Sequence, residues 1–151
     1  MKNIIFFLAF ISIISTGIAQ SSNELHNMIN NCLNDCLTDT RASSVALEGY
    51  PFRFRASDSV KNNLKNRQLK VVSITSPKFR KYLKKEQYVL LFDGIFLDSN
   101  KLIIQFSERS VQYKTKEKYL NIAISDWYKY IYEYSYEEKR WILIEKVFDG
   151  I

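Results

Sequence analysis

Five tyrosines recur at every second position near the C-terminal end of this chain. They are Tyr128, Tyr130, Tyr132, Tyr134 and Tyr136. Because successive side chains of a β-strand point to opposite faces, this alternation places all five phenol rings on one face of an extended strand. A polar stretch, 137–140, and a second apolar run, 141–148, follow the tyrosines. Together the two runs predict a β-hairpin.

The return strand of this hairpin begins with Trp141-Ile142-Leu143-Ile144 and is therefore apolar on both faces. Such a strand is typical of the interior of a sheet, so we expect the hairpin at the centre, covered at least partly on both sides. The register depends on the turn. A two- or four-residue turn places Tyr136 opposite Trp141, and a three-residue turn places Tyr134 opposite Ile142.

The first nineteen residues have the pattern of a signal peptide. Lys2 supplies a positive charge, 4–14 form an apolar core, and Gly17 and Ala19 are the small residues that a signal peptidase reads. The apolar core, of about eleven residues, is too short to span a bilayer, which takes about twenty. We expect cleavage after Ala19 and export of the remainder, to a periplasm or to the cell exterior.

The remainder, 20–151, has the length of one domain. Hydrophobic residues make up 46% of the sequence and aromatic residues 15%, which is too apolar for a disordered chain. After the signal peptide, no apolar run is long enough to predict a membrane span. The net charge of +6 is modest and the acids are interspersed with the bases, which argues against nucleic acid as a partner.

Apolar side chains at helical spacing predict an N-terminal helix over 22–38. This stripe comprises Leu25, Met28, Ile29, Cys32, Leu33, Cys36 and Leu37. Ser21 and Glu24 have the spacing of a capping box, in which both side chains satisfy backbone N–H groups of the first turn.

A second, weaker helix is expected over 59–68, with Ser57 or Asp58 as its cap. A strand over 69–75 follows, and Pro77 then begins a short helix, because proline at the first helical position loses no hydrogen bond.

The segment 41–55 alternates in polarity but is interrupted by Gly49 and Pro51. Since proline has no N–H for a central strand, we expect a loop or an edge segment here. Further along, apolar and aromatic runs predict an antiparallel meander, with Asp93-Gly94 as a bulge inside its first strand. The runs cover 88–97, 102–113, 119–125, 127–136 and 141–148.

These elements define an α+β fold. N-terminal helices are expected to pack on a curved, mainly antiparallel sheet of about five to six strands that ends in the Tyr/Trp-rich hairpin.

The two cysteines, Cys32 and Cys36, lie one turn apart on the predicted helix. Cβ atoms at this spacing are about 5–6 Å apart, whereas a disulfide needs about 3.5–4.5 Å. We therefore predict no disulfide between them and interpret both as small core residues. A metal site would need two further ligands, and the sequence has no other cysteine, so none is predicted.

Few residues have the chemistry of a catalytic site. The single histidine, His26, argues against a histidine-activated nucleophile and against catalytic zinc. Six acids lie on or beside the predicted strands, and we interpret them as parts of solvated faces and turns, with no catalytic residue and no cofactor predicted. They are Asp93, Asp98, Glu108, Asp126, Glu133 and Glu145.

The short helix after Pro77 is strongly basic. Its cations are Lys78, Arg80, Lys81, Lys84 and Lys85. They could bind an anionic surface such as a glycan, nucleic acid or lipid head groups. The alternative is the solvated face of an amphipathic helix.

The tyrosine stripe is the other candidate site. Each buried ring brings a hydroxyl that must reach water or a partner, which a dry core would not require. With Trp141 the stripe could form a face or pocket that binds a small apolar or aromatic ligand or a protein. The alternative is a sheet face half covered by the helices, with the hydroxyls at its edge.

The order of these elements, with Trp141-Ile142-Leu143-Ile144 as the last strand, resembles the nuclear-transport-factor-two-like (cystatin-like cone) fold. This resemblance covers nearly all of the chain from Ser21 to Phe148. It implies a cone-shaped pocket, frequent dimers, and either small-ligand binding or isomerase or dehydratase chemistry. The chain departs from the catalytic members because it has no interior histidine.

Three classes of function remain open. The first is a secreted or periplasmic binding or accessory module that uses the tyrosine face, possible also as a homodimer. The second is an inhibitor or immunity-type protein that binds a hydrolase or toxin. The third is a carboxylate-based enzyme with a cone-shaped pocket.

Overall fold

A computed structural model describes residues 23–47, 55–73, 76, 83, 87–114 and 119–150. This part of the chain contains two helices and one six-stranded sheet, so the predicted α+β class is confirmed. The helices are the N-terminal helix, described over 23–39, and α2 (Asp58–Asn66). The strands are β1 (Ser44–Ala46), β2 (Lys70–Val72), β3 (Gln87–Asp98), β4 (Lys101–Lys114), β5 (Tyr119–Ser135) and β6 (Arg140–Gly150).

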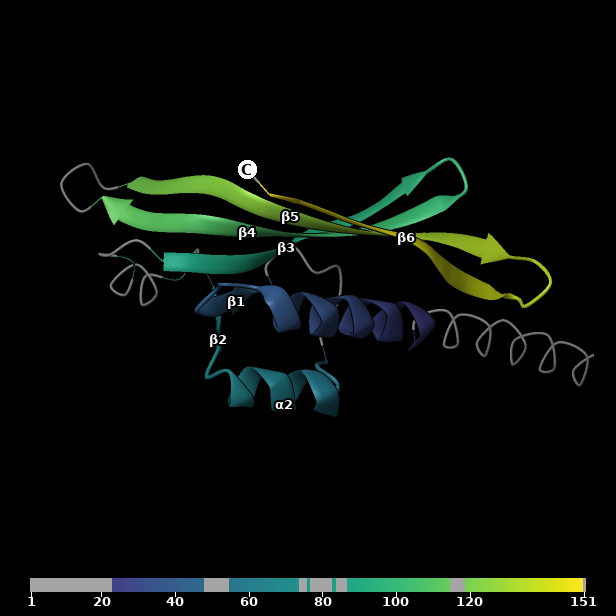
Figure 1. The fold of residues 1–151 in the computed structure, drawn as a ribbon, viewed down its shortest axis with the longest axis horizontal. Coiled ribbons are helices and arrows are strands. Elements are labelled where there is room, and N and C mark those ends of the chain that lie inside the picture. Colours follow the sequence, from purple (N-terminus) through teal and green to yellow (C-terminus); the bar gives the residue numbers. More distant parts are fainter. Residues whose placement is uncertain are drawn as a thin grey trace, which may run out of the picture.

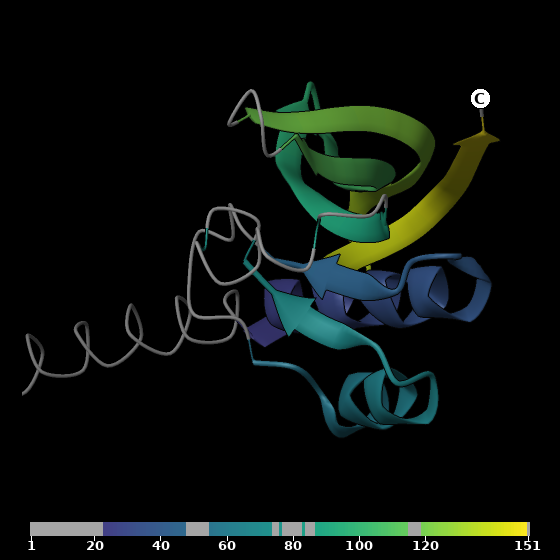
Figure 2. The ribbon, with the colours of Figure 1, turned by 90° about the vertical axis from the view of Figure 1, so that its left-hand side faces the viewer.

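The elements are stacked in tiers. Figure 1 shows the long strands above the N-terminal helix and α2 below it, and the same order is seen in Figure 2. The N-terminal helix therefore lies between the long strands and α2. Its position agrees with the main core, which joins buried residues of both helices to residues of β1, β3, β4 and β5.

The N-terminal helix forms where the apolar stripe predicts it. Six of the seven stripe residues are buried against the sheet and α2. They are Met28, Ile29, Cys32, Leu33, Cys36 and Leu37. Glu24 accepts a hydrogen bond from the backbone N–H of Trp141 (2.9 Å) and so links the helix to the start of β6. Ser21, the other residue of the expected capping box, lies outside the described residues.

The second helix, α2, is capped by Ser57, whose hydroxyl accepts a hydrogen bond from the N–H of Val60 (3.3 Å). Val60 and Leu64 are its buried residues, at the helical spacing of four. At its C-terminal end, the guanidinium of Arg67 donates hydrogen bonds to the backbone carbonyls of Leu37 and Thr40. Arg67 thereby satisfies free carbonyls at the end of the N-terminal helix.

The sheet has the order β2-β1-β3-β4-β5-β6. The prediction of a loop or edge segment over 41–55 is wrong for Ser44–Ala46, because β1 lies inside the sheet and pairs in parallel with both β2 and β3. The strand is only three residues long, and all three are buried. Pro51 comes after it in the sequence, so its missing N–H does not interrupt the ladder.

Strands β3 to β6 form the expected antiparallel meander. The bulge at Asp93-Gly94 is confirmed, since the β3–β4 register shifts between Phe92 and Gly94. Gly94 has a φ of 149°, a conformation that side-chain-bearing residues rarely adopt. The expected strands 119–125 and 127–136 are one strand, β5, which passes through a register shift at Ser125 instead of a turn.

The C-terminal hairpin differs from the prediction in position and register. It is not central: β6 is an edge strand, and Leu143 and Ile144 on it are exposed. Tyr134 pairs with Trp141, so neither expected register is right. The turn spans 136–139, one residue earlier than expected, and Lys139 in it has a left-handed backbone (φ 52°).

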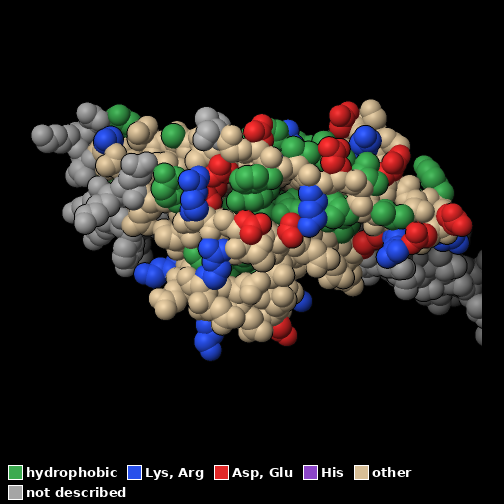
Figure 3. Space-filling view, viewed as in Figure 1, with side chains coloured by type: hydrophobic (Ala, Val, Ile, Leu, Met, Phe, Trp, Pro, Cys, Tyr) green, Lys and Arg blue, Asp and Glu red, His purple; other side chains and the backbone are tan. Residues whose placement is uncertain are grey.

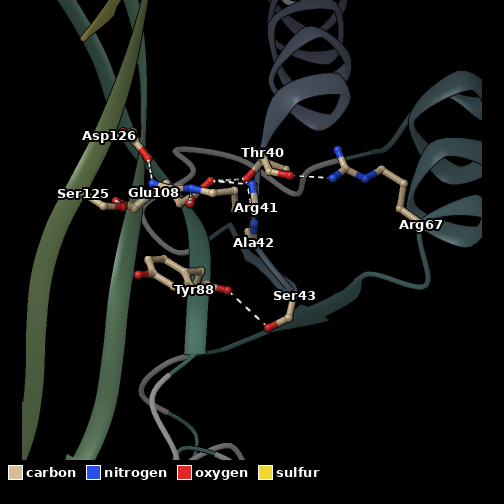
Figure 4. Close-up of polar contacts among 9 residues, drawn as sticks. All are labelled: Thr40, Arg41, Ala42, Ser43, Arg67, Tyr88, Glu108, Ser125 and Asp126. Carbon is tan, nitrogen blue, oxygen red and sulfur yellow. Dashed lines mark hydrogen bonds and ion pairs between the residues drawn. The ribbon is translucent and has the colours of Figure 1, made fainter. Parts of the chain in front are cut away.

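A buried acidic pair lies where the segment after the N-terminal helix meets the sheet (Figure 4). Glu108 and Asp126 were expected to be solvated, but both are buried, and Glu108 is only 1% exposed. They are directly opposite each other on β4 and β5, where two like charges would repel. Arg41 bridges them, pairing with Glu108 (3.2 Å) and with Asp126.

The carboxylate of Glu108 is hydrogen-bonded within this cluster. It accepts hydrogen bonds from the Thr40 hydroxyl (2.6 Å) and from the backbone N–H of Arg41 (2.9 Å). Asp126 and then Glu108 raise the pKa of the Arg41 guanidinium above its ordinary value. The cluster therefore fixes the chain between the N-terminal helix and β1 to the sheet, which sequence spacing alone could not reveal.

We predict that Glu108→Ala lowers the free energy of unfolding by about 3 kcal/mol, because it leaves the buried Thr40 hydroxyl and the partly buried Arg41 N–H without their acceptor. Urea denaturation measures this loss. Glu145→Ala is the matched control, since Glu145 is exposed on β6 and its loss should cost less than about 0.5 kcal/mol. Equal effects of the two substitutions would contradict a special role for Glu108.

A tyrosine-lined groove beside the N-terminal helix

Three of the five tyrosines lie under the N-terminal helix. Tyr128, Tyr130 and Tyr132 are buried in the main core, with exposed fractions of 7%, 3% and 6%. Their even spacing on β5 directs all three toward the helix. The expected tyrosine face therefore exists for these rings, and the helix covers it.

Two of the hydroxyls end at the cysteines of the helix. The Tyr132 oxygen is 3.2 Å from the sulfur of Cys32, and the Tyr130 oxygen is 3.2 Å from the sulfur of Cys36. Two residues along a strand cover about 6.8 Å, and four residues along a helix cover about 6 Å. The two cysteines and the two tyrosines are therefore almost equally spaced along the helix and the strand, which run in opposite directions, so each phenol contacts one thiol.

The Tyr130 hydroxyl also donates a hydrogen bond to the carboxylate of Asp35 (3.0 Å). Asp35 lies on the polar edge of the helix, so this hydrogen bond joins the buried Tyr130 ring to a residue at the surface. The buried ring thus has its polar end satisfied at the margin of the helix, as a buried tyrosine requires.

Burial controls the acidity of these groups. It raises the pKa of Cys32 to about 12, an effect that the hydrogen bond between Cys32 and Tyr132 only partly offsets. Burial likewise raises the pKa of Cys36, Tyr130 and Tyr132 above their ordinary values. Both thiols are free and buried, and they are protonated at neutral pH, so they are poor nucleophiles.

A groove runs along the margin between this helix and β6. It consists of two cavities, of about 320 and 580 Å³, a size that suits small ligands. Both are lined by Asp35, Tyr130 and Lys146. The smaller is completed by Asn31, Cys32, Asn34, Thr38, Tyr132 and Leu143. The larger is completed by Asp39, Tyr128, Lys129, Val147 and Phe148.

An ion pair lies where the two cavities meet. The Lys146 ammonium is 2.9 Å from the Asp35 carboxylate and 5.8 Å from the centre of the Tyr130 ring. Both side chains are about half exposed. Lys146 and Asp35 thus connect the two walls of the groove across the rings beneath them.

The larger cavity has an apolar lip. Phe148 is 63% exposed and contacts Tyr128, with ring centres 5.0 Å apart. Figure 3 shows one face of the molecule on which hydrophobic side chains form a band along the sheet, with acidic and basic side chains beside it. The site therefore combines aromatic surface with charges of both signs.

The other predicted aromatic residues lie outside this groove. Tyr134 contacts Trp141 and Tyr136 edge to face, and Trp141 packs at the margin of the core. Tyr136 is beyond the end of β5 and is 87% exposed, so the prediction that it shares the strand face is wrong. The alternation continues by one position past the strand.

The basic residues predicted as an anion-binding helix fall outside the described residues. They are Lys78, Arg80, Lys81, Lys84 and Lys85. Between them only Leu83 is described; it is buried, and its carbonyl accepts a hydrogen bond from the Tyr113 N–H (2.8 Å).

Sequence reasoning did not select Asp35, Lys146 or Phe148. A partial signal for Asp35 existed, because Asn31, Asp35 and Asp39 recur every four residues and form a polar row beside the apolar stripe. Lys146 gave no such signal, since a bulge in β6 decides which way it points.

No family model, curated protein or solved structure matches this chain. The resemblance to the nuclear-transport-factor-two-like fold therefore stays a prediction. Within the part of the chain that the structure describes, no group of three or more His, Cys, Asp or Glu side chains is placed to hold a metal ion. None of the described helices has the length and apolarity needed to cross a bilayer.

We predict that the folded state loses stability as the pH rises above about 9. An ordinary thiol releases its proton near pH 9.0, whereas Cys32 in the folded state keeps it to about pH 12. Between these values the folded state binds more protons, so the free energy of unfolding falls with pH, by about 1.4 kcal/mol per pH unit for one group. The other buried thiol and phenols act in the same direction.

Urea denaturation between pH 8 and 10.5 measures this slope. Cys32→Ala should make it shallower, and Tyr136→Phe should leave it unchanged, because Tyr136 is exposed. A slope that Cys32→Ala does not alter would contradict the assignment.

Proposed function

We propose that this chain is an exported binding module that holds a small ligand in the groove between the N-terminal helix and β6. The observation that carries this proposal is the pair of adjoining cavities over Tyr128, Tyr130 and Tyr132. Tyrosines supply large contact area with a polar end, which suits a ligand that is partly apolar.

The arrangement of the aromatic rings favours a small ligand over a flat protein-binding face. The three groove tyrosines are buried, so they form a floor that a molecule can reach only from the groove. The same proposal includes a fold from Ser21 to Phe148 in which the helices pack into a strongly curved, cone-like sheet, and a signal peptide cleaved after Ala19. Both are inferred from the sequence pattern.

We predict that Phe148→Ala weakens ligand binding about two- to tenfold, as expected for the loss of one aromatic contact. A screen of small aromatic compounds by NMR would use the ring protons of Tyr128 and Phe148 as reporters. Tyr136→Ala is the matched control, because it removes an exposed aromatic ring outside the groove. If compounds bind but the two variants affect affinity equally, the groove is not the binding site.

A second candidate function is association with a protein along β6. This strand is eleven residues long, lies at the sheet edge, and exposes Leu143, Ile144 and Phe148. No described strand pairs with its outer side, and an exposed edge of this kind can pair with a strand of a second copy or of another protein.

We predict that any self-association through this edge is abolished by Ile144→Lys, because a charged side chain on an edge strand blocks further pairing. Analytical ultracentrifugation measures the mass of both proteins. A dimer that persists in the variant would exclude β6 as its interface.

A further inference from the structure

Resting on the proposed function, we infer that the groove recognises an alkylammonium group, and that Lys146 occupies this ammonium site when no ligand is bound. The ligand class is therefore an amine that carries an apolar or aromatic body. Three observations carry this inference: the contacts of Lys146, the charges around the larger cavity, and the exposure of the ion pair.

The contacts of Lys146 are those that a bound ammonium ion would make. Its nitrogen is 2.9 Å from the Asp35 carboxylate and lies within cation–π range of the Tyr130 ring, at 5.8 Å. Asp35 is held in place by the Tyr130 hydroxyl, at 3.0 Å. A carboxylate and an aromatic ring, fixed to each other, thus already accommodate one ammonium group.

The charges of the larger cavity also favour a cation. Asp39 lines this cavity, and no described residue forms an ion pair with it. Lys129 lines it as well, but its ammonium lies 3.9 Å from the centre of the Trp127 ring, which the alternation of β5 places on the opposite face of the sheet. Among the described lining residues, the charge of Asp39 is therefore the one that has no opposite charge paired with it on this face.

Lys146 is held weakly enough to be displaced. Its ion pair with Asp35 is about half exposed, and pairs of this kind contribute little to stability. A ligand ammonium can therefore take its place on Asp35, while the body of the ligand lies against Tyr128 and Phe148 in the larger cavity. Lys146 can then extend into solvent on its flexible side chain.

Three probes of similar size test this inference: benzylamine, benzyl alcohol and phenylacetate, which are cationic, neutral and anionic at pH 7. NMR titration of the purified protein gives their dissociation constants. We expect benzylamine to bind about two- to fivefold more tightly than the other two, which is the factor that a half-exposed ion pair provides.

Two variants locate the ammonium site. Asp35→Asn keeps an oxygen that can accept the Tyr130 hydrogen bond but removes the charge, and it should abolish the preference for benzylamine. Lys146→Ala removes the competing ammonium and should tighten benzylamine binding about two- to fivefold. Lys139→Ala, in the exposed turn before β6, is the matched control and should change nothing.

The outcomes separate this inference from the function on which it rests. If all three probes bind in the groove with equal affinity, or phenylacetate binds most tightly, the ammonium site is wrong and the binding groove stands. If none of the three perturbs the groove resonances, both are overturned. A Lys146→Ala variant that binds benzylamine more weakly than the unchanged protein would also refute the displacement of Lys146.

Discussion

The contact between the N-terminal helix and the tyrosines of β5 is the constraint on which the rest of the structure depends. A buried tyrosine ring carries a hydroxyl that needs a hydrogen-bond partner, and here that partner has to come from the helix. Cys32 and Cys36 meet two of these hydroxyls, and Asp35 receives a hydrogen bond from one of them at the helix margin. The same packing that forms the core therefore leaves a polar, aromatic groove beside it.

The periodic elements of the fold could be predicted from the sequence. The N-terminal helix and α2 follow from apolar spacing and a serine cap, and the long strands follow from aromatic and β-branched runs. The position of β6 could not be predicted, because an apolar strand at an edge has the same pattern as a central one. The strand β1 was missed because three residues are too few for periodicity to show.

The residues of the candidate groove were selected from the sequence only in part. Tyrosine alternation selected Tyr128, Tyr130 and Tyr132, which line the groove, whereas Tyr136 continues the pattern beyond the strand. Glu108 and Asp126 could not be distinguished from solvated strand residues, since their burial depends on Arg41, which lies 67 and 85 residues away in the sequence. Long-range partners of this kind leave no local signal.

The bulge at Ile144 determines where the strand β6 can lose a residue. Leu143 and Lys146 both face the helix although they are three positions apart, because Ile144 has no partner on β5. Ile144 is thus the bulged residue that separates two stretches of regular side-chain alternation. A deletion of this one residue would preserve the facing of every other side chain in β6, whereas a deletion elsewhere in the strand would invert one part relative to the other. The wall of the groove that β6 forms therefore tolerates the deletion of one residue at Ile144.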